Sequence, residues 1–186
     1  MISISKAELK DICKKDLEKI LDWRNKESVR KVMYNSNIIL LEEHLNWYEG
    51  LKDSNTSLSK VFYYDNVPYG ILNINKIDRT NNKCEWGFYI GANDAPKGMG
   101  TLLGYTSLNY IFGELSIRKL CAEVISFNNK SVTFHQKLGF SKEGLLRKHV
   151  IKNDRFHDVH LFGLFKEEWE KNSLNIRSLI EGRYFL

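Results

Sequence analysis

The fold is decided by two neighbouring stretches, EWGFYI at residues 85–90 and APKGMGTLL at residues 95–103, which predict a strand that leads through a glycine-bearing loop into a helix. Aromatic and β-branched residues are frequent in the first stretch, as in a strand. In the second, Gly98 and Gly100 would let a ligand approach the backbone closely. The free N–H groups at the start of the helix would then form a site for a pyrophosphate.

The glycine spacing is not specific by itself. A Walker A motif, GxxxxGK[ST], does not occur, and a dinucleotide-binding GxGxxG fails because Leu103 stands where the third glycine belongs. A Gly-x-Gly before a helix also occurs in ordinary tight turns. The loop therefore allows two interpretations, an anion site and a plain turn.

A second motif follows a strand predicted at residues 119–125. The sequence NNKSVTFHQKLGF at residues 128–140 opens with Asn128, a typical helix N-cap, and Gly139 is a typical helix end. Helical spacing places His135 on the same face as the apolar residues three positions before and after it. The order strand, glycine loop, helix, strand and Asn-opened helix is far more specific than either motif alone.

Hydrophobic periodicity predicts the remaining elements and an α+β class in which helices flank one mixed sheet. The strands before residue 91 should form an antiparallel meander, because turn-type residues separate them. Residues 152–155 are predicted to be a turn, and residues 170–186 a polar tail, with room for one helical turn after residue 167. The predicted strands cover residues 7–12, 60–65, 69–77, 84–90, 119–125, 141–151 and 156–165, and the predicted helices start after Asp16 and cover 41–51, 98–113 and 128–139.

Length and composition favour a single globular domain over residues 1–186. With 186 residues, 42% of them hydrophobic and 12% aromatic, the chain can bury one sizeable core but not two full-sized ones. It has no apolar run of roughly eighteen residues, which argues against a membrane span. The first eight residues reach charged side chains at once, unlike a signal peptide, so a cytoplasmic protein is expected.

Cysteine usage and charge bear on further classes. Cys13, Cys84 and Cys121 are widely spaced, without CxxC or a zinc-spaced His pair, so neither disulfides nor a metal site is expected. The 28 basic and 23 acidic residues leave a net charge of +5, which suits an anionic ligand such as a nucleotide. Because basic and acidic residues are interspersed, a nucleic-acid partner is not expected.

Together, the two motifs resemble the GNAT superfamily of N-acetyltransferases over about residues 7–169. The resemblance implies a central, mostly antiparallel sheet that splays between two strands, flanking helices, and acetyl-CoA as cosubstrate without a metal. The family pattern before the cofactor helix is Gln/Arg-x-x-Gly-x-Gly/Ala, and Ala95 replaces its long polar residue. Main-chain N–H groups carry most of the pyrophosphate binding, so the site should survive this change. The implied acetyl-CoA-binding residues are Phe88, Tyr89, Ile90, Lys97, Gly98, Met99, Gly100, Thr101, Asn128 and Ser131.

The resemblance also indicates which groups would transfer protons. The family commonly has a tyrosine in the Asn-opened helix, where its hydroxyl can protonate the departing CoA thiolate, and His135 stands there in this chain. An imidazole with an ordinary pKa of about 6.5 could do the same, although a packing role is the alternative. Glu85 and Glu123 are both candidates to take the proton of the amine, and the sequence does not rank them. No GxSxG-like nucleophile motif occurs, so direct attack on acetyl-CoA is expected.

The acceptor side is expected in the N-terminal third, where aromatic and polar residues mix. Trp23-Arg24-Asn25, Met33-Tyr34, the helix around His44 and residues 142–144 and 158–162 resemble one subgroup of the superfamily. Its members acetylate the 4-amino group of UDP-4-amino-4,6-dideoxy-N-acetyl-beta-L-altrosamine in pseudaminic-acid biosynthesis. Aromatic rings would stack on the base and an arginine would pair with phosphate. The residues that would border this nucleotide-sugar pocket are Arg24, Met33, Tyr34 and His44.

Other acceptors stay open. A ribosomal-protein or peptide N-terminal acetyltransferase would share Glu143-Gly144 and the aromatic ending near Trp169. A polyamine or aminoglycoside acetyltransferase would favour an acidic chain, which a net charge of +5 does not offer. A non-catalytic acyl-CoA-binding module would need the glycines but no base. A homodimer is compatible with all of these interpretations.

Overall fold

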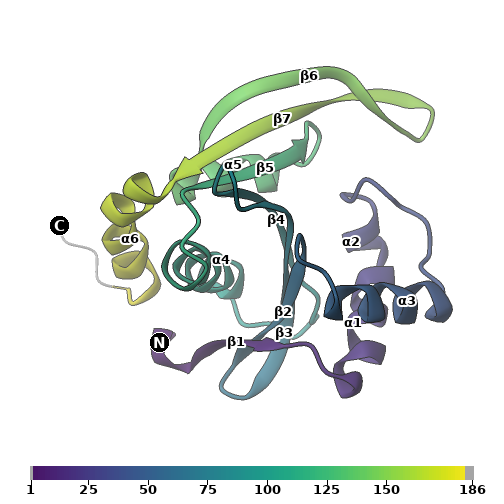
Figure 1. The fold of residues 1–186 in the computed structure, drawn as a ribbon, viewed down its shortest axis with the longest axis horizontal. Coiled ribbons are helices and arrows are strands. Elements are labelled where there is room, and N and C mark those ends of the chain that lie inside the picture. The colour runs from purple at the N-terminus through teal and green to yellow at the C-terminus, as the bar shows by residue number, and fades with distance from the viewer. Residues whose placement is uncertain (1, 183–186) are drawn as a thin grey trace.

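A seven-stranded sheet in the order β1-β2-β3-β4-β5-β7-β6 forms the centre of the computed structural model, which describes residues 2–182 (Figure 1). The predicted antiparallel meander of β1 to β4 is confirmed, and β5, β7 and β6 continue the sheet as antiparallel neighbours. Only β4 and β5 pair in parallel among the described strands. The strands are β1 (Ala7–Asp11), β2 (Leu58–Tyr64), β3 (Val67–Asp78), β4 (Lys83–Ile90), β5 (Lys119–Ile125), β6 (Ser141–Lys152) and β7 (Arg155–Phe165).

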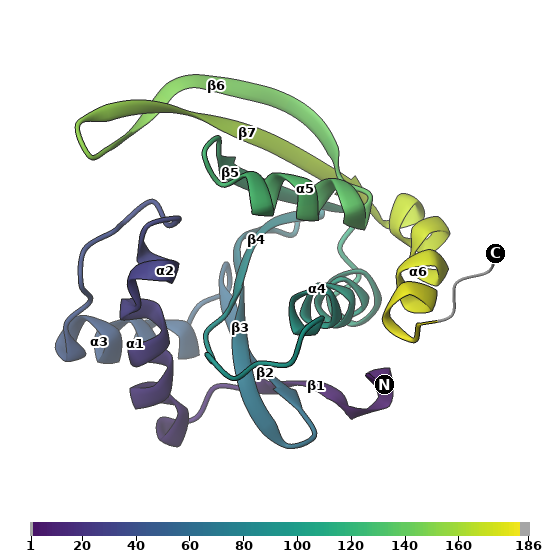
Figure 2. The ribbon, with the colours of Figure 1, turned by 180° about the vertical axis from the view of Figure 1, so that it is seen from behind.

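Helices cover both faces of the sheet, as Figure 1 and Figure 2 show from opposite sides. On one face, Ile20 of α1 packs against Val61 and Ile71 of the sheet. On the other face, α4, α5 and α6 enclose the larger core cluster, to which they contribute Leu108, Leu138 and other apolar residues. The helices are α1 (Leu17–Asn25), α2 (Glu27–Arg30), α3 (Leu41–Lys52), α4 (Met99–Asn109), α5 (Asn129–Leu138) and α6 (Lys166–Ile180), and short turns of helix cover Ile4–Lys6, Lys14–Asp16 and Tyr110–Glu114.

The sheet opens between β4 and β5. The two strands pair over three positions, Lys83 with Lys119, Cys84 with Leu120 and Glu85 with Cys121. Beyond this last pair the strands continue without pairing, so their backbones diverge from Trp86 and Ala122 onward. The splay that the family resemblance implied is therefore present, and it begins directly after Glu85.

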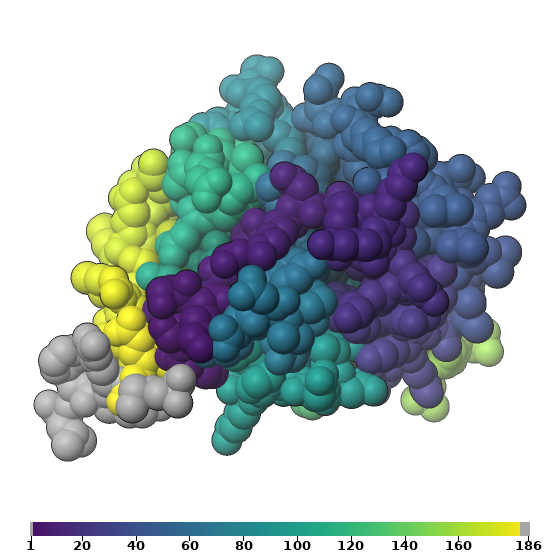
Figure 3. All heavy atoms as spheres, turned by 90° about the horizontal axis from the view of Figure 1, so that it is seen from below, coloured from purple at the N-terminus to yellow at the C-terminus, as the bar shows by residue number. Residues whose placement is uncertain are grey.

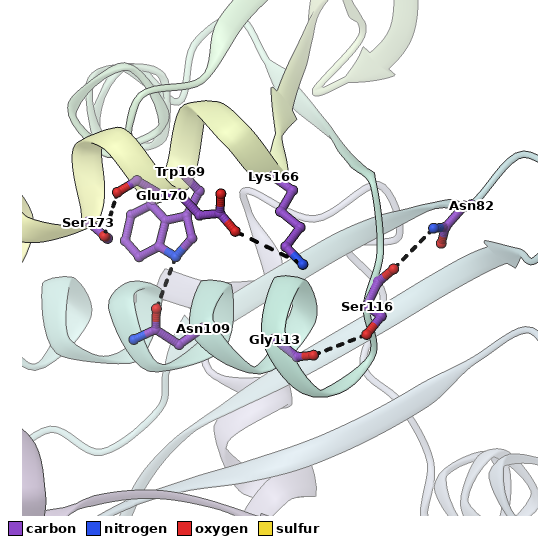
Figure 4. Close-up of polar contacts among 8 residues, drawn as sticks. All are labelled: Asn82, Asn109, Gly113, Ser116, Lys166, Trp169, Glu170 and Ser173. Atoms are coloured by element: carbon purple, nitrogen blue, oxygen red, sulfur yellow. Dashed lines mark hydrogen bonds and ion pairs between the residues drawn. The ribbon is translucent and has the colours of Figure 1, made fainter.

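The C-terminal segment differs from the expected polar tail. Residues Lys166–Ile180 form the 15-residue helix α6, which begins where the Glu168 carboxylate accepts the Phe165 N–H at 2.8 Å. Trp169 is 2% exposed, and its indole N–H donates to Asn109 of α4 at 3.0 Å (Figure 4). Only one stripe of α6 meets the core, so most residues of this segment are polar. The segment is therefore polar on average, and this average concealed an amphipathic helix.

The N-terminal segment lies against the end of the chain. Ile2 and Ile4 pack on the same cluster as Ile180 of α6. Figure 3 shows this segment crossing the surface from the side of α6 towards α1. Helix α1 starts directly after Asp16, as predicted, and Asp16 is its N-cap residue. Its carboxylate does not cap the helix, because it accepts hydrogen bonds from the Cys13 N–H and the Tyr63 hydroxyl instead.

The hairpin of β6 and β7 is longer than expected and bends over the sheet towards the segment after α2 (Figure 1, Figure 2). Its turn consists of two residues, Asn153 and Asp154, both with positive φ (48° and 56°), as in the tight turns typical of hairpins. Lys152 and Arg155 were expected in the turn, but they are the last paired residues of the two strands. Strand pairing therefore places Lys152 at the hairpin tip.

Candidate active site

A cavity of about 740 Å³ extends through the opening between β4 and β5. On the helix α5 side it is lined by Trp86, Phe88 and His135, and on the helix α1 side by Arg24 and Trp47. This continuity follows from the splay, because two paired strands would have closed the passage with their backbone hydrogen bonds. The cavity can therefore receive one molecule from each face of the sheet.

Two carboxylates from different strands face the part of the cavity on the α1 side. Glu85 is on the last paired position of β4, and Lys76 donates to it at 3.0 Å. Glu123 is two residues past the end of pairing on β5, with Lys76 Nζ 4.0 Å away. The hydroxyl of Tyr34 donates a hydrogen bond to Glu123 Oε2. Glu85 is thus neutralised by a closer cation, whereas Glu123 lies in the opening and carries a neutral donor.

His135 is 4% exposed and surrounded by aromatic rings. Its ring stacks on Phe162 at 5.5 Å between centroids, and Trp86 and Phe140 meet it edge-on. The Nδ1–H donates to the Ser131 carbonyl at 2.8 Å, which leaves Nε2 as the nitrogen without a proton in the neutral ring. Burial lowers the pKa of His135 to about 4, although the bond to Ser131 acts in the opposite direction.

This arrangement argues against the acid role expected for His135. A neutral imidazole whose only proton is held by a carbonyl has none to give to a thiolate. The sequence suggested an acid because it showed the position in the motif but not the ring's surroundings. The structure favours the packing alternative, with Nε2 as a hydrogen-bond acceptor at most.

Arg24 borders the cavity at the end near the segment after α2. One guanidinium nitrogen donates to the Asn35 carbonyl at 2.9 Å, while Nη1 is buried without a partner. Burial, with a smaller contribution from the charge of Arg30, lowers the pKa of Arg24. A buried donor without an acceptor is costly, so this nitrogen indicates a place for an anionic or carbonyl group of a ligand.

The other residues expected on the acceptor side also meet in this cavity, in unequal roles. Met33 and Tyr34 line it from the segment after α2. His44 lines it from α3, but its Nε2 donates to the Leu17 carbonyl at 2.9 Å and its ring stacks on Trp47. Burial lowers the pKa of His44. This histidine ties α3 to α1, so its side chain is already committed to the fold.

The residues expected to bind acetyl-CoA divide into two groups. Phe88, Tyr89, Asn128 and Ser131 line the cavity. The glycine loop and the start of α4 lie outside it, together with Ile90. Asn128 Oδ1 also accepts the Ser131 N–H at 3.3 Å as the N-cap of α5, which gives it a structural task in addition.

The start of α4 has the properties of an anion site. Gly98 adopts a left-handed conformation (φ 99°) as the residue before the helix, and it has no side chain to cap the first N–H groups. A Cβ atom on Gly100 would meet nothing within 4 Å, so space is open above the backbone there. Met99 is 1% exposed, so only its main chain can face a ligand.

The cysteines do not form a nucleophilic site. None of them lines the cavity. Burial raises the pKa of the Cys84 thiol to about 12 and also raises that of Cys121, while the Asp16 carboxylate raises that of Cys13. Thiols with raised pKa values are poor nucleophiles, which supports direct attack by an amine.

The sequence reasoning missed several polar residues that line the cavity. Asn73 and Asn75 line it from β3, where they alternate with the buried Leu72 and Ile74. This alternation was visible in the sequence and could have placed the two asparagines on the acceptor face. Lys76 also lines the cavity but breaks the alternation, because the strand is irregular after Asn75 and Lys76 has a positive φ of 50°. Within residues 2–182 no group of three or more His, Cys, Asp or Glu side chains is arranged to hold a metal ion, and no helix there combines the length and apolar character of a membrane span.

Comparison with known families matches residues 9–161 to the model described as "Acetyltransferase (GNAT) domain". Among curated proteins, the SPbeta prophage-derived uncharacterized N-acetyltransferase YokL of Bacillus subtilis is 36% identical over 110 residues. That alignment spans 58% of this chain and 61% of YokL, so the chain spans about three fifths of that relative's length. The family is thereby supported over most of the chain.

More distant proteins align over longer stretches. The acetyltransferase PseH of Campylobacter jejuni is 27% identical over 126 residues, which cover 68% of this chain and 77% of PseH. The crystal structure of spermidine N-acetyltransferase from Vibrio cholerae in complex with CoA and spermine superposes with a TM-score of 0.83 at 21% identity, covering 89% of this chain and 99% of that one. At this identity the superposition shows the fold alone.

Proposed function

This chain belongs to the GNAT acetyltransferase family, and we propose that it transfers the acetyl group of acetyl-CoA directly to the amine of a nucleotide-linked amino sugar. Acetyl-CoA would enter from the α4 and α5 side of the sheet, with its pyrophosphate on the N–H groups around Gly98 and Gly100. The amino sugar would enter from the α1 side. The two substrates would meet at the opening between β4 and β5.

In this proposal Glu123 takes the proton of the acceptor amine. Its carboxylate lies in the opening of the sheet and is held by the Tyr34 hydroxyl rather than by a close cation. As the amine nitrogen bonds to the acetyl carbon, the carbon–sulfur bond breaks, the thiolate leaves and the amine proton passes to the carboxylate. Glu85 would instead keep Lys76 in place through their ion pair.

The observation that carries the substrate class is the unpartnered, buried Nη1 of Arg24. Two further cations lie near it, because Arg30 and Lys152 each interact with Arg24 electrostatically. Over the described residues none of these three cations has a carboxylate partner within 4.0 Å. The end of the cavity at Arg24 is therefore positively charged, which suits a phosphate or pyrophosphate. The rings of Tyr34 and Trp47 offer surfaces on which a nucleotide base can stack.

The rival acceptor class is a polyamine. A polycation would be attracted by Glu85 and Glu123 but repelled by Arg24, Arg30 and Lys152, and one of the two carboxylates is already paired with Lys76. The similarity to PseH of Campylobacter jejuni favours the same subgroup that the sequence motifs suggested, at 27% identity. The proposed substrate is therefore UDP-4-amino-4,6-dideoxy-N-acetyl-beta-L-altrosamine or a close analogue.

The test is an acceptor comparison. The protein is incubated with acetyl-CoA and, separately, with the UDP-amino-sugar, with spermidine and with a peptide bearing a free N-terminus, and the acetylated products are identified by mass spectrometry. Acetylation of the nucleotide sugar at a kcat/KM at least about a hundredfold above the others would support the proposal, since buried polar groups discriminate on that scale. Preferential acetylation of spermidine or peptide would overturn it.

A variant links the result to the cavity. Arg24→Met removes the charge and should raise the KM for the nucleotide sugar about tenfold or more, as expected for a charge-assisted bond to phosphate, while the KM for acetyl-CoA changes little. Lys26→Met is the matched control, because Lys26 donates outside the cavity, to Gly91 and Asn93. Equal effects of both variants would indicate general electrostatics and not a phosphate site.

A further inference from the structure

Four consecutive carbonyls in the segment after α2 accept hydrogen bonds from cationic side chains. Lys152 Nζ donates to the carbonyls of Met33 at 2.5 Å and Tyr34 at 2.6 Å. Arg24 donates to the next carbonyl, that of Asn35, at 2.9 Å. Arg30 donates to the carbonyl after it, that of Ser36, at 2.7 Å. The segment that carries Tyr34 is therefore anchored through its main chain.

Lys152 comes from the far end of the chain. It is separated by 119 positions from Met33, and it is the last residue of β6 before the two-residue turn. Its side chain is 8% exposed, and within the described residues it forms no ion pair with a carboxylate. Burying an ammonium group is costly unless it is hydrogen-bonded, so the two carbonyls must compensate for the lost hydration. An exposed lysine would have served solubility equally well.

Tyr34, whose carbonyl accepts a hydrogen bond from Lys152, also reaches the proposed reaction site. The Tyr34 side chain, 49% exposed, leaves the segment towards the sheet and donates to Glu123. Met33 and Tyr34 both line the cavity, while Lys152 itself does not. Tyr34 thus connects the hairpin tip to the Glu123 carboxylate, through its main-chain carbonyl at one end and its hydroxyl at the other.

We infer that Lys152 is a positioning residue, which holds the main chain at Met33 and Tyr34 so that the Tyr34 hydroxyl orients the Glu123 carboxylate towards the acceptor amine. Three geometric observations support the inference: two hydrogen bonds from one buried ammonium group, the adjacent anchors at Arg24 and Arg30, and the bond from Tyr34 to Glu123. The kinetic consequence rests on the proposed acetyl transfer. The anchoring of the segment does not.

The kinetic test is a double-mutant cycle on the full chain. Lys152→Met and Tyr34→Phe should each lower kcat by about ten- to a hundredfold, which is the scale expected when a catalytic group is misplaced by about 1 Å. Because both changes act on one arrangement, the double variant should lose no more than about twofold beyond the larger single loss. The KM for acetyl-CoA should not change in any of the three. Losses that multiply would overturn the inference.

Two further variants separate positioning from general effects. Lys152→Arg keeps the charge and the donors and should recover most of the kcat that Lys152→Met loses. Lys148→Met removes a charge from the same strand. The hydrogen bond of Lys148 to Asp158 comes from its main-chain N–H and not from its side chain, so this variant should behave as wild type. If Lys152→Met lowers the melting temperature and Lys152→Arg does not restore both stability and kcat, the residue is merely structural and the inference fails.

Limited proteolysis tests the anchoring without any acceptor. Trypsin can cleave after the exposed Lys31, at the start of the segment. With the anchor removed, Lys152→Met should be cleaved there several times faster than wild type, while Lys148→Met and Tyr34→Phe should not. An unchanged cleavage rate in Lys152→Met would overturn the inference even if the enzyme were active. Faster cleavage in a chain that acetylates none of the acceptors would refute the proposed function but not the anchoring.

Discussion

The Tyr34 hydroxyl donates a hydrogen bond to Glu123 Oε2 across the cavity and so joins two residues that lie 89 positions apart. Burial and the Glu123 bond raise the pKa of Tyr34, so the hydroxyl keeps its proton and remains the donor. Glu85, in contrast, has Lys76 as its partner at 3.0 Å. The two glutamates, equivalent in the sequence, therefore differ in environment.

The first prediction ranks these two glutamates. Glu123→Gln should lower kcat at least about a hundredfold, because general-base catalysis typically contributes that much, while Glu85→Gln should lower it less than about tenfold. Steady-state kinetics with the acceptor identified by mass spectrometry provides the measurement. The two variants control for each other, since each removes one charge beside Lys76. The reverse order would show that Glu85 is the base.

The second prediction concerns His135 in catalysis. His135→Phe keeps an aromatic ring of similar size among Phe162, Phe140 and Trp86, so kcat should fall less than about tenfold. A general acid at this position would instead be worth about a hundred- to ten-thousandfold. The same kinetic assay distinguishes the two cases. A large loss of kcat with an unchanged melting temperature would restore the role as an acid.

The third prediction is a pH dependence of stability. Because the pKa of His135 is about 4 in the folded chain and about 6.5 when unfolded, the unfolded state binds more protons between these values. The contribution of His135 to the free energy of unfolding should therefore have its full value above about pH 6.5 and decrease towards pH 4. Between pH 7.5 and pH 5 the loss from this group should be about 2 kcal/mol.

Urea unfolding at the two pH values, for wild type and His135→Phe, isolates this contribution. Other groups, including His44, whose pKa is also lowered, titrate in both proteins and cancel in the comparison. The variant should lose clearly less stability than wild type on acidification. Identical losses would mean that His135 titrates normally in the folded chain.

The fourth prediction tests the pyrophosphate site. Gly100→Val places a side chain in the open space over the first turn of α4, so the KM for acetyl-CoA should rise about tenfold or more, as expected if N–H groups of a helix start bind the anion. Gly50→Val is the matched control: it is also a helical glycine whose Cβ would meet nothing within 4 Å, but it lies in α3. Unchanged KM values in a folded Gly100→Val protein would refute the site.

The fifth prediction concerns α6. Trp169 packs on Tyr105 at 5.6 Å between ring centroids and donates to Asn109, so Trp169→Ala should destabilise the chain by about 3 to 5 kcal/mol. Leu174→Ala, in the same helix but 68% exposed, should change stability by no more than about 0.5 kcal/mol. Denaturant unfolding measures both. Equal small effects would show that the helix is not docked as described.

Much of the fold was predictable because its signals are local. The strands of the meander, the helix after Gly98 and the helix between Asn128 and Gly139 follow from side-chain periodicity and from caps, which depend on neighbouring residues only. Local signals failed at α6, where the average polarity of the segment concealed a single buried stripe with Trp169 and Ile176. They also placed Lys152 in a turn instead of at the end of β6.

The residue types available for chemistry, and most of the elements that carry them, can be read from the sequence. The surroundings of each side chain come from the tertiary structure. The pKa of His135 depends on rings from β4 and β7, the partner of Glu123 comes from the segment after α2, and that segment is anchored by the tip of the β6–β7 hairpin. Burial, charge and hydrogen bonding depend on neighbours that are distant in the chain, so no reading of spacing could have assigned these roles.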